Sequence, residues 1–184
     1  MSLLKTYHQP FLHIEIKNFL PKKNALKLLN ALVKEPLYLK ESDLFKFKQT
    51  KDLSTSNSTQ EFIKALKDNL TNIERITNHP LNPNKIDTSV TQYEDTDFLL
   101  CHDDKLEKRG VAFMYYLSTL KEKDGGCLNL YKTKNRAPRK VMKKIYPSFN
   151  TLIVFPVTSF SFHAVEEVIS NKKRITLSGW VYEN

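Results

Sequence analysis

The stretch TQYEDTDFLLCHDD, residues 91–104, determines how the chain is interpreted, because its apolar run ends in a histidine and an aspartate two positions apart. In an extended strand, residues i and i+2 project from the same face about 7 Å apart, so His102 and Asp104 can converge on one cation. The only later histidine, His163, lies in the strand-like stretch TSFSFHAVEEV. These three residues are the candidate metal ligands.

A single His-x-Asp tripeptide is a weak signal, and a hydrogen-bonded histidine at a strand end is the alternative interpretation of His102. The joint pattern is more specific, since a lone histidine and then an alternating strand that opens with Arg174 follow further along the chain. Two histidines and one carboxylate form the facial triad of non-haem Fe(II) oxygenases, which leaves metal positions open for ligands. The pattern therefore predicts a non-haem iron site.

From Lys85 the apolar pattern has a period of two, and turn signals divide it into eight strand-like segments. They are KIDTSVTQY, DFLLCHD, VAFMYYLS, GCLNLYK, KVMKKIYP, TLIVFPV, FSFHAVEEV and KRITLSGWVY. Eight strands fit a double-stranded β-helix, a jelly-roll or cupin-like barrel of two facing sheets with the site inside. The fold class we expect is mainly β with flanking helices.

The last of these strands has two different faces. Ile175, Leu177, Gly179 and Val181 share an aliphatic face, while the alternate positions carry polar or amphipathic side chains. The alternate positions are Arg174, Thr176, Ser178 and Trp180. An arginine beside threonine and serine favours a polar cavity, so we expect the aliphatic face to contact the helices.

The first 84 residues predict a strand and two amphipathic helices. Residues 11–16 alternate as FLHIEI, and apolar residues recur at helical spacing over 25–33 and 62–76. The polar stretch 48–59 is typical of a mobile surface loop. We expect the two helices to cover the outer face of one sheet.

The composition is that of an ordinary globular protein, with 40% hydrophobic and 27% charged residues. A chain of 184 residues can bury one sizeable core and is too short for two such barrels. We therefore expect a single domain over residues 1–184, with supporting elements in 1–84 and the β-helix in 85–184.

The sequence favours a cytoplasmic location without membrane contact. Cys101 and Cys127 are too few for a disulfide framework and lie in apolar strand contexts. The first thirty residues lack a signal-peptide core, and no stretch approaches the ~20 apolar residues needed to cross a bilayer.

Residues 132–144 form a basic run with seven lysines and arginines and no acidic residue. Together with the net charge of +9, this run favours an acidic partner or an RNA-rich environment such as a ribosome. A solvated hairpin between two strands is the alternative. Aromatic side chains that would stack on bases are absent from the run, so we do not expect direct nucleic-acid binding.

From about Lys85 to the C-terminus, the chain resembles the iron- and 2-oxoglutarate-dependent dioxygenases, and within them the prolyl hydroxylases. The segments FLLCHDD, VAFMYYL, DGGCLNLY, FNTLIVFPVTSFSFHAVEEV and KRITLSGWVY carry the resemblance in that order. They are most similar to the ribosomal prolyl hydroxylases, which act on a protein of the small-subunit decoding centre. Bacterial single-domain relatives, associated with other translation proteins, are similar as well.

The resemblance implies a protein prolyl hydroxylase that uses Fe(II), 2-oxoglutarate and dioxygen, with ascorbate as a possible stimulant. Its substrate would be a ribosomal protein or a translation factor. Fe(II) would be held by His102, Asp104 and His163. Arg174 would pair with the far carboxylate of 2-oxoglutarate, because a guanidinium is a planar and permanently charged fork.

The resemblance also implies further contacts in the cosubstrate pocket. Tyr93 and Tyr116 would line it and hydrogen-bond to 2-oxoglutarate, whereas the neighbouring Tyr115 should face the other way. Trp180 would form a wall of the active site, and Ser178 is a further candidate contact. The alternatives are a hydroxylase of a free amino acid or other small molecule, and a catalytically silent barrel used as a binding module.

Overall fold

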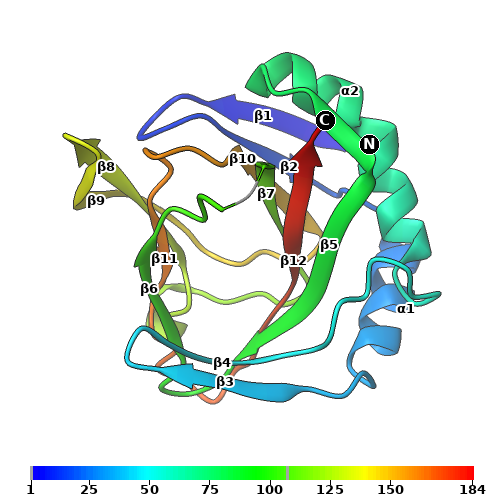
Figure 1. Cartoon of the computed structure of the whole chain (residues 1–184). Helices are drawn as coiled ribbons and strands as arrows, with labels where there is room; N and C mark the ends of the chain where they lie inside the picture. The colour runs from blue at the N-terminus through cyan, green and yellow to red at the C-terminus, as the bar shows by residue number, and fades with distance from the viewer. Residues whose placement is uncertain (1, 107) are drawn as a thin grey trace.

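The structure is a computed structural model, and it describes residues 2–106 and 108–184. The described residues form twelve β-strands, two α-helices and one short 3-10 helix (Figure 1). In chain order they are β1 (Leu3–Tyr7), β2 (His13–Lys17), α1 (Lys22–Leu32), β3 (Tyr38–Ser42), β4 (Phe45–Gln49), α2 (Gln60–Thr77), β5 (Leu81–Tyr93), β6 (Phe98–His102), β7 (Arg109–Tyr116), η1 (Glu122–Asp124), β8 (Leu128–Lys134), β9 (Ala137–Ile145), β10 (Thr151–Pro156), β11 (His163–Val165) and β12 (Arg174–Glu183).

The strands form two facing sheets that are joined at one side. The first sheet has the order β1-β2-β10-β7-β12-β5, and the second has the order β6-β11-β8-β9. Strand β4 connects them, because Lys48 pairs with Gln92 of β5 and Phe45 pairs with Leu99 of β6. The eight strands β5–β12 are those that the period-two pattern predicted, so the double-stranded β-helix is confirmed.

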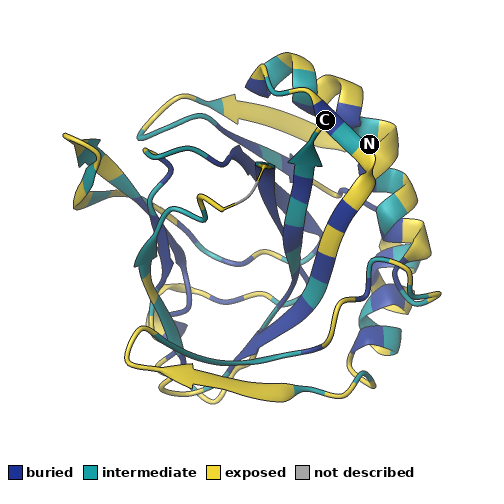
Figure 2. Cartoon of the chain, in the orientation of Figure 1, coloured by how far each residue is buried: buried dark blue, intermediate teal, exposed yellow. Residues whose placement is uncertain are grey.

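The two helices cover the outer face of the first sheet, as predicted (Figure 1). Leu177 and Val181 on β12 are buried in the same apolar cluster as Phe62 and Leu66 on α2. Arg174 lies on the opposite face of β12 and is also buried, inside the barrel. Figure 2 shows this alternation of buried positions, with the most exposed residues on the helices and on the outlying strands. Within the described residues, no helix is both long and apolar enough to cross a membrane.

The polar stretch 48–59 is a loop from Thr50 onward, as its composition predicted, but three of its residues anchor the loop in the core. Strand β4 includes its first two residues, and Thr50, Leu53 and Thr59 are buried. The Thr50 amide donates to the carbonyl of Val90, and the Thr50 hydroxyl accepts from the Val90 amide. Polar side chains of a loop can be buried in this way when neighbouring backbone groups satisfy them.

Gly179 of β12 lies directly against the backbone of β5. A Cβ atom at this position would overlap the carbonyl of Asp87 and lie 2.9 Å from Cζ of Phe113. We expect Gly179→Ala to lower the free energy of unfolding by about 1–3 kcal/mol, because the two strands must separate to admit the methyl group. Urea denaturation measures the change, with Asn84→Ala on the exposed part of β5 as the control. An unchanged midpoint for Gly179→Ala would contradict this strand packing.

Candidate active site

The three candidate ligands meet at the junction of β6 and β11. His102 is the last residue of β6 and lies opposite His163, the first residue of β11, in the antiparallel pairing. Asp104 lies beyond the end of β6, where its φ of 60° turns the chain into the left-handed region. Aspartate tolerates this region better than most residues do. A turn after the strand therefore brings the carboxylate to the histidines, and not the strand alternation that the sequence suggested.

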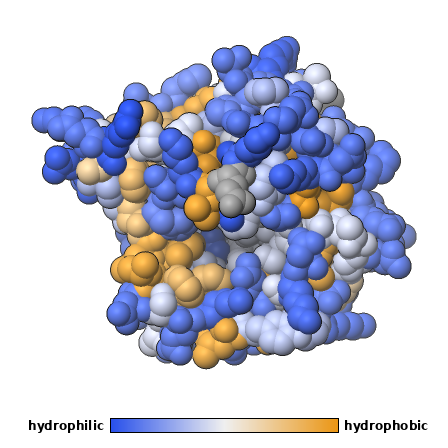
Figure 3. All heavy atoms as spheres, in the orientation of Figure 1, coloured by the Kyte–Doolittle hydropathy of each residue, from blue (hydrophilic) through white to orange (hydrophobic). Residues whose placement is uncertain are grey.

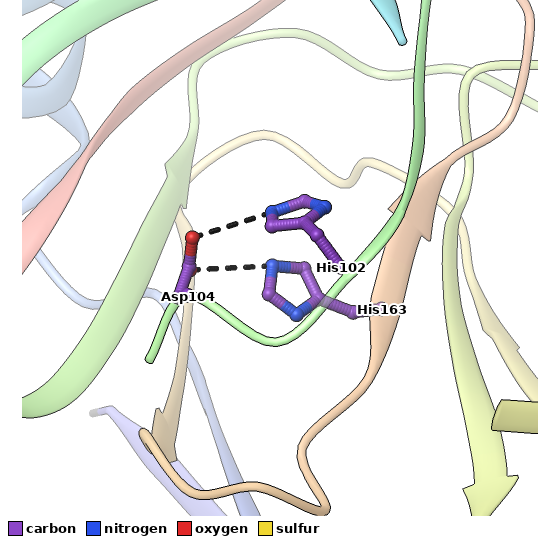
Figure 4. A group of neighbouring side chains, drawn as sticks. All are labelled: His102, Asp104 and His163. Carbon is purple, nitrogen blue, oxygen red and sulfur yellow. Dashed lines mark ion pairs between the residues drawn. The ribbon is translucent and has the colours of Figure 1, made fainter. Parts of the chain in front are cut away.

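The ligand atoms of the three side chains all lie within 4.8 Å of one another. Oδ1 of Asp104 is 3.3 Å from Nε2 of His102, and Oδ2 is 3.4 Å from Nε2 of His163 (Figure 4). Each histidine donates from Nδ1 to a backbone carbonyl, His102 to Leu100 at 2.8 Å and His163 to Ser161 at 2.9 Å. These hydrogen bonds fix both rings with Nε2 toward the carboxylate, which is the usual orientation of histidine ligands.

The charges in this group favour a cation. Burial alone would raise the pKa of Asp104, but its hydrogen bonds with His102 and His163 hold that pKa far below its usual range. Burial alone would lower the pKa of His102, and the pairing with Asp104 raises it instead. The carboxylate is therefore held in its ionised form between two imidazole nitrogens. Two histidine nitrogens with one carboxylate are the donor set of the iron facial triad.

No other group of this kind occurs in residues 2–106 and 108–184. His13 is buried in β2, where its Nδ1 donates to the carbonyl of Phe11. Nδ1 of His79 lies 2.9 Å from the carboxylate of Glu183. Neither histidine lines the cavity next to the triad.

A cavity of about 260 Å³ extends from the triad into the barrel, and Arg174 lies in its wall. The Arg174 side chain is 1% exposed; its Nε donates to the carbonyl of Gly126 at 2.9 Å and its Nη1 donates to the Thr176 hydroxyl at 3.4 Å. Its Nη2 has no partner among the described residues, and no described carboxylate forms an ion pair with it. Because a buried unpaired charge is costly, this geometry suits an anionic ligand such as a carboxylate.

Two tyrosines flank the guanidinium. The ring centroids of Tyr93 and Tyr116 lie 5.0 and 5.4 Å from Cζ of Arg174. Burial raises the pKa of both phenols, so each remains a neutral hydrogen-bond donor. The Tyr116 hydroxyl is buried without a partner in the described part of the chain. Tyr115 faces the other way, as expected, and donates to Oδ1 of Asn150 at 2.7 Å in the core below the helices.

Ser178 and Trp180 also line the cavity, on the face of β12 that the alternation predicted. The Ser178 hydroxyl donates to Oγ1 of Thr176 at 3.0 Å, and Thr176 lies 2.6 Å from Oγ1 of Thr91. These hydroxyls form a polar strip next to Arg174. The indole nitrogen of Trp180 is buried and lacks a partner among the described residues. The roles of these residues toward a ligand remain predictions.

Arg109 was not selected from the sequence, and the structure places it in the wall of the cavity. Its guanidinium lies 3.5 Å from the ring centroid of Trp180. Its Nη1 donates to the backbone carbonyl of Asp104 at 3.3 Å and lies 4.0 Å from the Asp104 carboxylate. Arg109 therefore supports the turn that presents the carboxylate of the candidate ligand Asp104. Its only sequence signal is a cation five residues after Asp104, at the start of the next strand.

The glycine pair Gly125–Gly126 was also not selected from the sequence. Both residues have a φ of 68°, and a Cβ atom on Gly125 would overlap the carbonyl of Glu167. This turn presents the Gly126 carbonyl that accepts from Arg174. The glycine pair therefore helps to hold the Arg174 side chain in the cavity wall.

A facial triad inside a double-stranded β-helix, facing a buried unpaired arginine, defines the class of non-haem iron oxygenases. Residues 88–182 match the 2OG-Fe(II) oxygenase superfamily. The chain belongs to this superfamily, whose metal, cosubstrate and oxidant are Fe(II), 2-oxoglutarate and dioxygen.

The chain is similar to prolyl hydroxylases in sequence and in fold. It is 40% identical over 182 residues to the prolyl 3-hydroxylase OGFOD1 of Mus musculus, covering 94% of this chain and 33% of that protein. It is 32% identical over 169 residues to the prolyl 3,4-dihydroxylase OGFOD1 of Ostreococcus tauri, covering 79% and 32%. The chain thus spans about a third of the length of these curated relatives. A prolyl-4-hydroxylase structure from Pseudomonas putida superposes with a TM-score of 0.77 at 18% identity, covering 94% and 92%.

We expect Asp104→Ala to weaken the binding of a divalent metal by more than ~100-fold. Loss of a residue that only supports a ligand costs ~10–100-fold, and this substitution removes the one anionic ligand of the triad itself. Calorimetric titration of the metal-free protein with Mn(II) measures this without turnover. Asp103→Ala is the matched control, since among the described residues Asp103 accepts a hydrogen bond only from the backbone amide of Lys105. Equal Mn(II) affinity in the two variants would remove Asp104 from the site.

Arg174→Lys keeps the charge but loses the planar fork and the hydrogen bond to Gly126. A charge-assisted hydrogen bond contributes about 1.5–3 kcal/mol, so we expect the Kd for 2-oxoglutarate to rise roughly 10–100-fold. The affinity for Mn(II) should not change. Titration of the Mn(II)-loaded protein with 2-oxoglutarate tests this, and Lys173→Gln, next in the chain but paired with Glu94, is the control. An unchanged Kd would show that the cosubstrate carboxylate binds elsewhere.

Proposed function

We propose that the protein is an Fe(II)- and 2-oxoglutarate-dependent hydroxylase of prolyl residues in a protein substrate. The observation that carries the proposal is the cavity that joins the triad of His102, Asp104 and His163 to the unpaired guanidinium of Arg174. The similarity to proteins named prolyl hydroxylases supports the choice of substrate residue.

In this proposal the protein binds and orients, while the bound groups supply the chemistry. Fe(II) and 2-oxoglutarate would provide activation of dioxygen, with decarboxylation of 2-oxoglutarate to succinate and transfer of one oxygen atom to a C–H bond. His102, Asp104 and His163 would hold the metal. Arg174 would neutralise the far carboxylate of 2-oxoglutarate, so no side chain is needed as a nucleophile.

The neighbouring side chains would orient 2-oxoglutarate and keep water away from it. Tyr93 and Tyr116 are neutral phenols beside Arg174 and can donate hydrogen bonds to a carboxylate. Phe47 of β4 stacks on Tyr93 with ring centroids 5.1 Å apart and closes the side of the barrel. Exclusion of water strengthens every electrostatic interaction inside the cavity.

The region nearer the mouth would receive the substrate. Trp180 forms an aromatic wall there and is held in place by the stacked Arg109. A flat apolar surface suits a prolyl ring, which has no charge and no donor. Ser178 lies deeper, beside Thr176, and would contact the cosubstrate.

We propose a ribosomal protein or a translation factor as the substrate, modified in the cytoplasm. The sequence resemblance to ribosomal prolyl hydroxylases supports this choice. The net charge of +9 would favour association with RNA-rich particles. The two cysteines form no disulfide, and a reducing compartment suits them.

Mass spectrometry of proteins from cells with and without the gene tests this function. We expect prolyl residues of a translation protein to carry one or two added oxygen atoms only when the active protein is present. Cells that express Asp104→Ala in place of the natural chain are the control and should lack the modification. Fragmentation and comparison with hydroxyproline standards would assign the ring carbon. Hydroxylation of a free amino acid alone, or no release of succinate from 2-oxoglutarate, would overturn the proposal.

A further inference from the structure

The hairpin of β8 and β9 extends beyond the rest of the second sheet. Strand β11 pairs with β8 only at residues Leu128–Leu130, so residues 132–140 pair with each other alone. Figure 1 shows this end of the hairpin protruding from the barrel at the upper left, and Figure 2 shows that much of its surface is exposed. We name residues 132–140 the basic ribbon.

The basic ribbon carries five exposed cations: Lys132, Lys134, Arg136, Arg139 and Lys140. None of them takes part in an ion pair formed by the described residues. The two lysines at the base of the hairpin differ, since Lys144 pairs with Glu166 at 2.7 Å and Lys143 lies 3.3 Å above the ring of Tyr7. Figure 3 shows a hydrophilic surface at this projection. Within this hairpin, the unpaired cations are therefore confined to the part that protrudes from the barrel.

The arrangement of these cations opposes formation of the hairpin. Tyr131 pairs with Val141 and Thr133 pairs with Pro138, so Lys132 lies opposite both Arg139 and Lys140 at a bulge. Like charges opposite each other destabilise an antiparallel pair. Repulsion of this kind is relieved when an anion binds between the cations.

The turn of the basic ribbon also carries a cation at a position that costs stability. Asn135 and Arg136 have φ values of 54° and 57°, both in the left-handed region. A two-residue turn of this type favours glycine at the second position, where Arg136 lies. A left-handed conformation costs a residue with a Cβ atom roughly 1–2 kcal/mol. An arginine at this position holds a cation at the tip of the hairpin at the expense of stability.

We propose that the basic ribbon binds the phosphate backbone of RNA. RNA offers closely spaced negative charges, and binding releases its counterions. Residues 132–140 include no aromatic or large apolar side chain that could serve as the anchor a protein interface needs. The lack of aromatic residues also means that binding does not read bases, so it is independent of RNA sequence. From the sequence alone we did not expect direct nucleic-acid binding. The exposure and mutual repulsion of the five cations in the structure favour it.

The ribbon lies next to the candidate active site. Leu130, at its base, is the direct neighbour of His163 across the β8–β11 pair. RNA bound to the ribbon would therefore be held beside the strand that carries a metal ligand. The RNA contact itself does not depend on the proposed hydroxylase activity, and it can be measured without metal or cosubstrate.

Fluorescence anisotropy with a labelled single-stranded RNA of mixed sequence tests the proposal on the full metal-free chain. The ribbon variant replaces all five cations of the ribbon by glutamine. The control variant has the same net charge and replaces five exposed lysines of the helical side by glutamine: Lys22, Lys23, Lys27, Lys34 and Lys67. We expect the ribbon variant to bind RNA at least tenfold more weakly, with a slope of log K against log salt that is smaller by about 3. The control variant should stay within about threefold of the natural chain, since phosphate contacts are short-ranged in salt.

Equal losses in the two variants would overturn the proposal, because net charge alone would then explain RNA binding. Displacement of the RNA by polyglutamate at matched charge concentration would also overturn it in favour of an acidic protein partner. Arg174→Lys should bind RNA normally, so failure of the proposed enzyme function is separable from failure of this inference.

A single substitution separates binding from folding. Arg136→Gly removes one cation and suits the left-handed turn, so we expect a higher melting temperature together with weaker RNA binding, by about twofold to fivefold. Asn135→Gly changes the same turn without a change of charge and should leave the RNA affinity unchanged. Unchanged affinity in Arg136→Gly would remove the tip from the binding surface.

Discussion

The active site depends on the antiparallel pairing of β6 with β11, which places His102 opposite His163. Opposed residues in an antiparallel pair have Cβ atoms about 4.5–5.5 Å apart, so backbone hydrogen bonds alone bring the two imidazoles to a shared cation. The carboxylate then needs only a turn, which the left-handed Asp104 supplies and Arg109 supports. The stability of the sheet thereby determines the geometry of the candidate metal ligands.

The second half of the site uses a charge that the protein does not neutralise. Arg174 donates hydrogen bonds to the Gly126 carbonyl and to the Thr176 hydroxyl, which hold its side chain in place. Among the described residues, no aspartate or glutamate forms an ion pair with it. Such a charge lowers the stability of the free protein, and an anionic ligand offsets that cost. Tyr93 and Tyr116 cover the guanidinium with ring faces, which leaves it short of water as well. Binding of an anion is therefore favoured by the folded structure itself.

The eight core strands could be predicted from the sequence, because alternation of apolar and polar residues over a long segment indicates a strand with one buried face. It also identified the residues that meet at the site, since an isolated histidine in a strand is easy to recognise. It did not predict β4, whose side chains are half-buried and whose backbone pairs with strands of both sheets. It also did not select Arg109, because its contacts with Asp104 and Trp180 arise from a turn and a stacking interaction between distant strands. Tertiary contacts of this kind have no period in the sequence.

Unpaired cations occur in two environments of this molecule, and the environment decides what each can recognise. Arg174 is buried, so its interaction with an anion is strong, directional and little affected by salt. The cations of the basic ribbon are exposed to solvent, so each contributes little alone and their combined attraction falls steeply with salt. The first environment suits one small carboxylate, and the second suits a long polyanion without regard to sequence. A protein with both can hold a small cosubstrate tightly while it associates reversibly with a large charged particle.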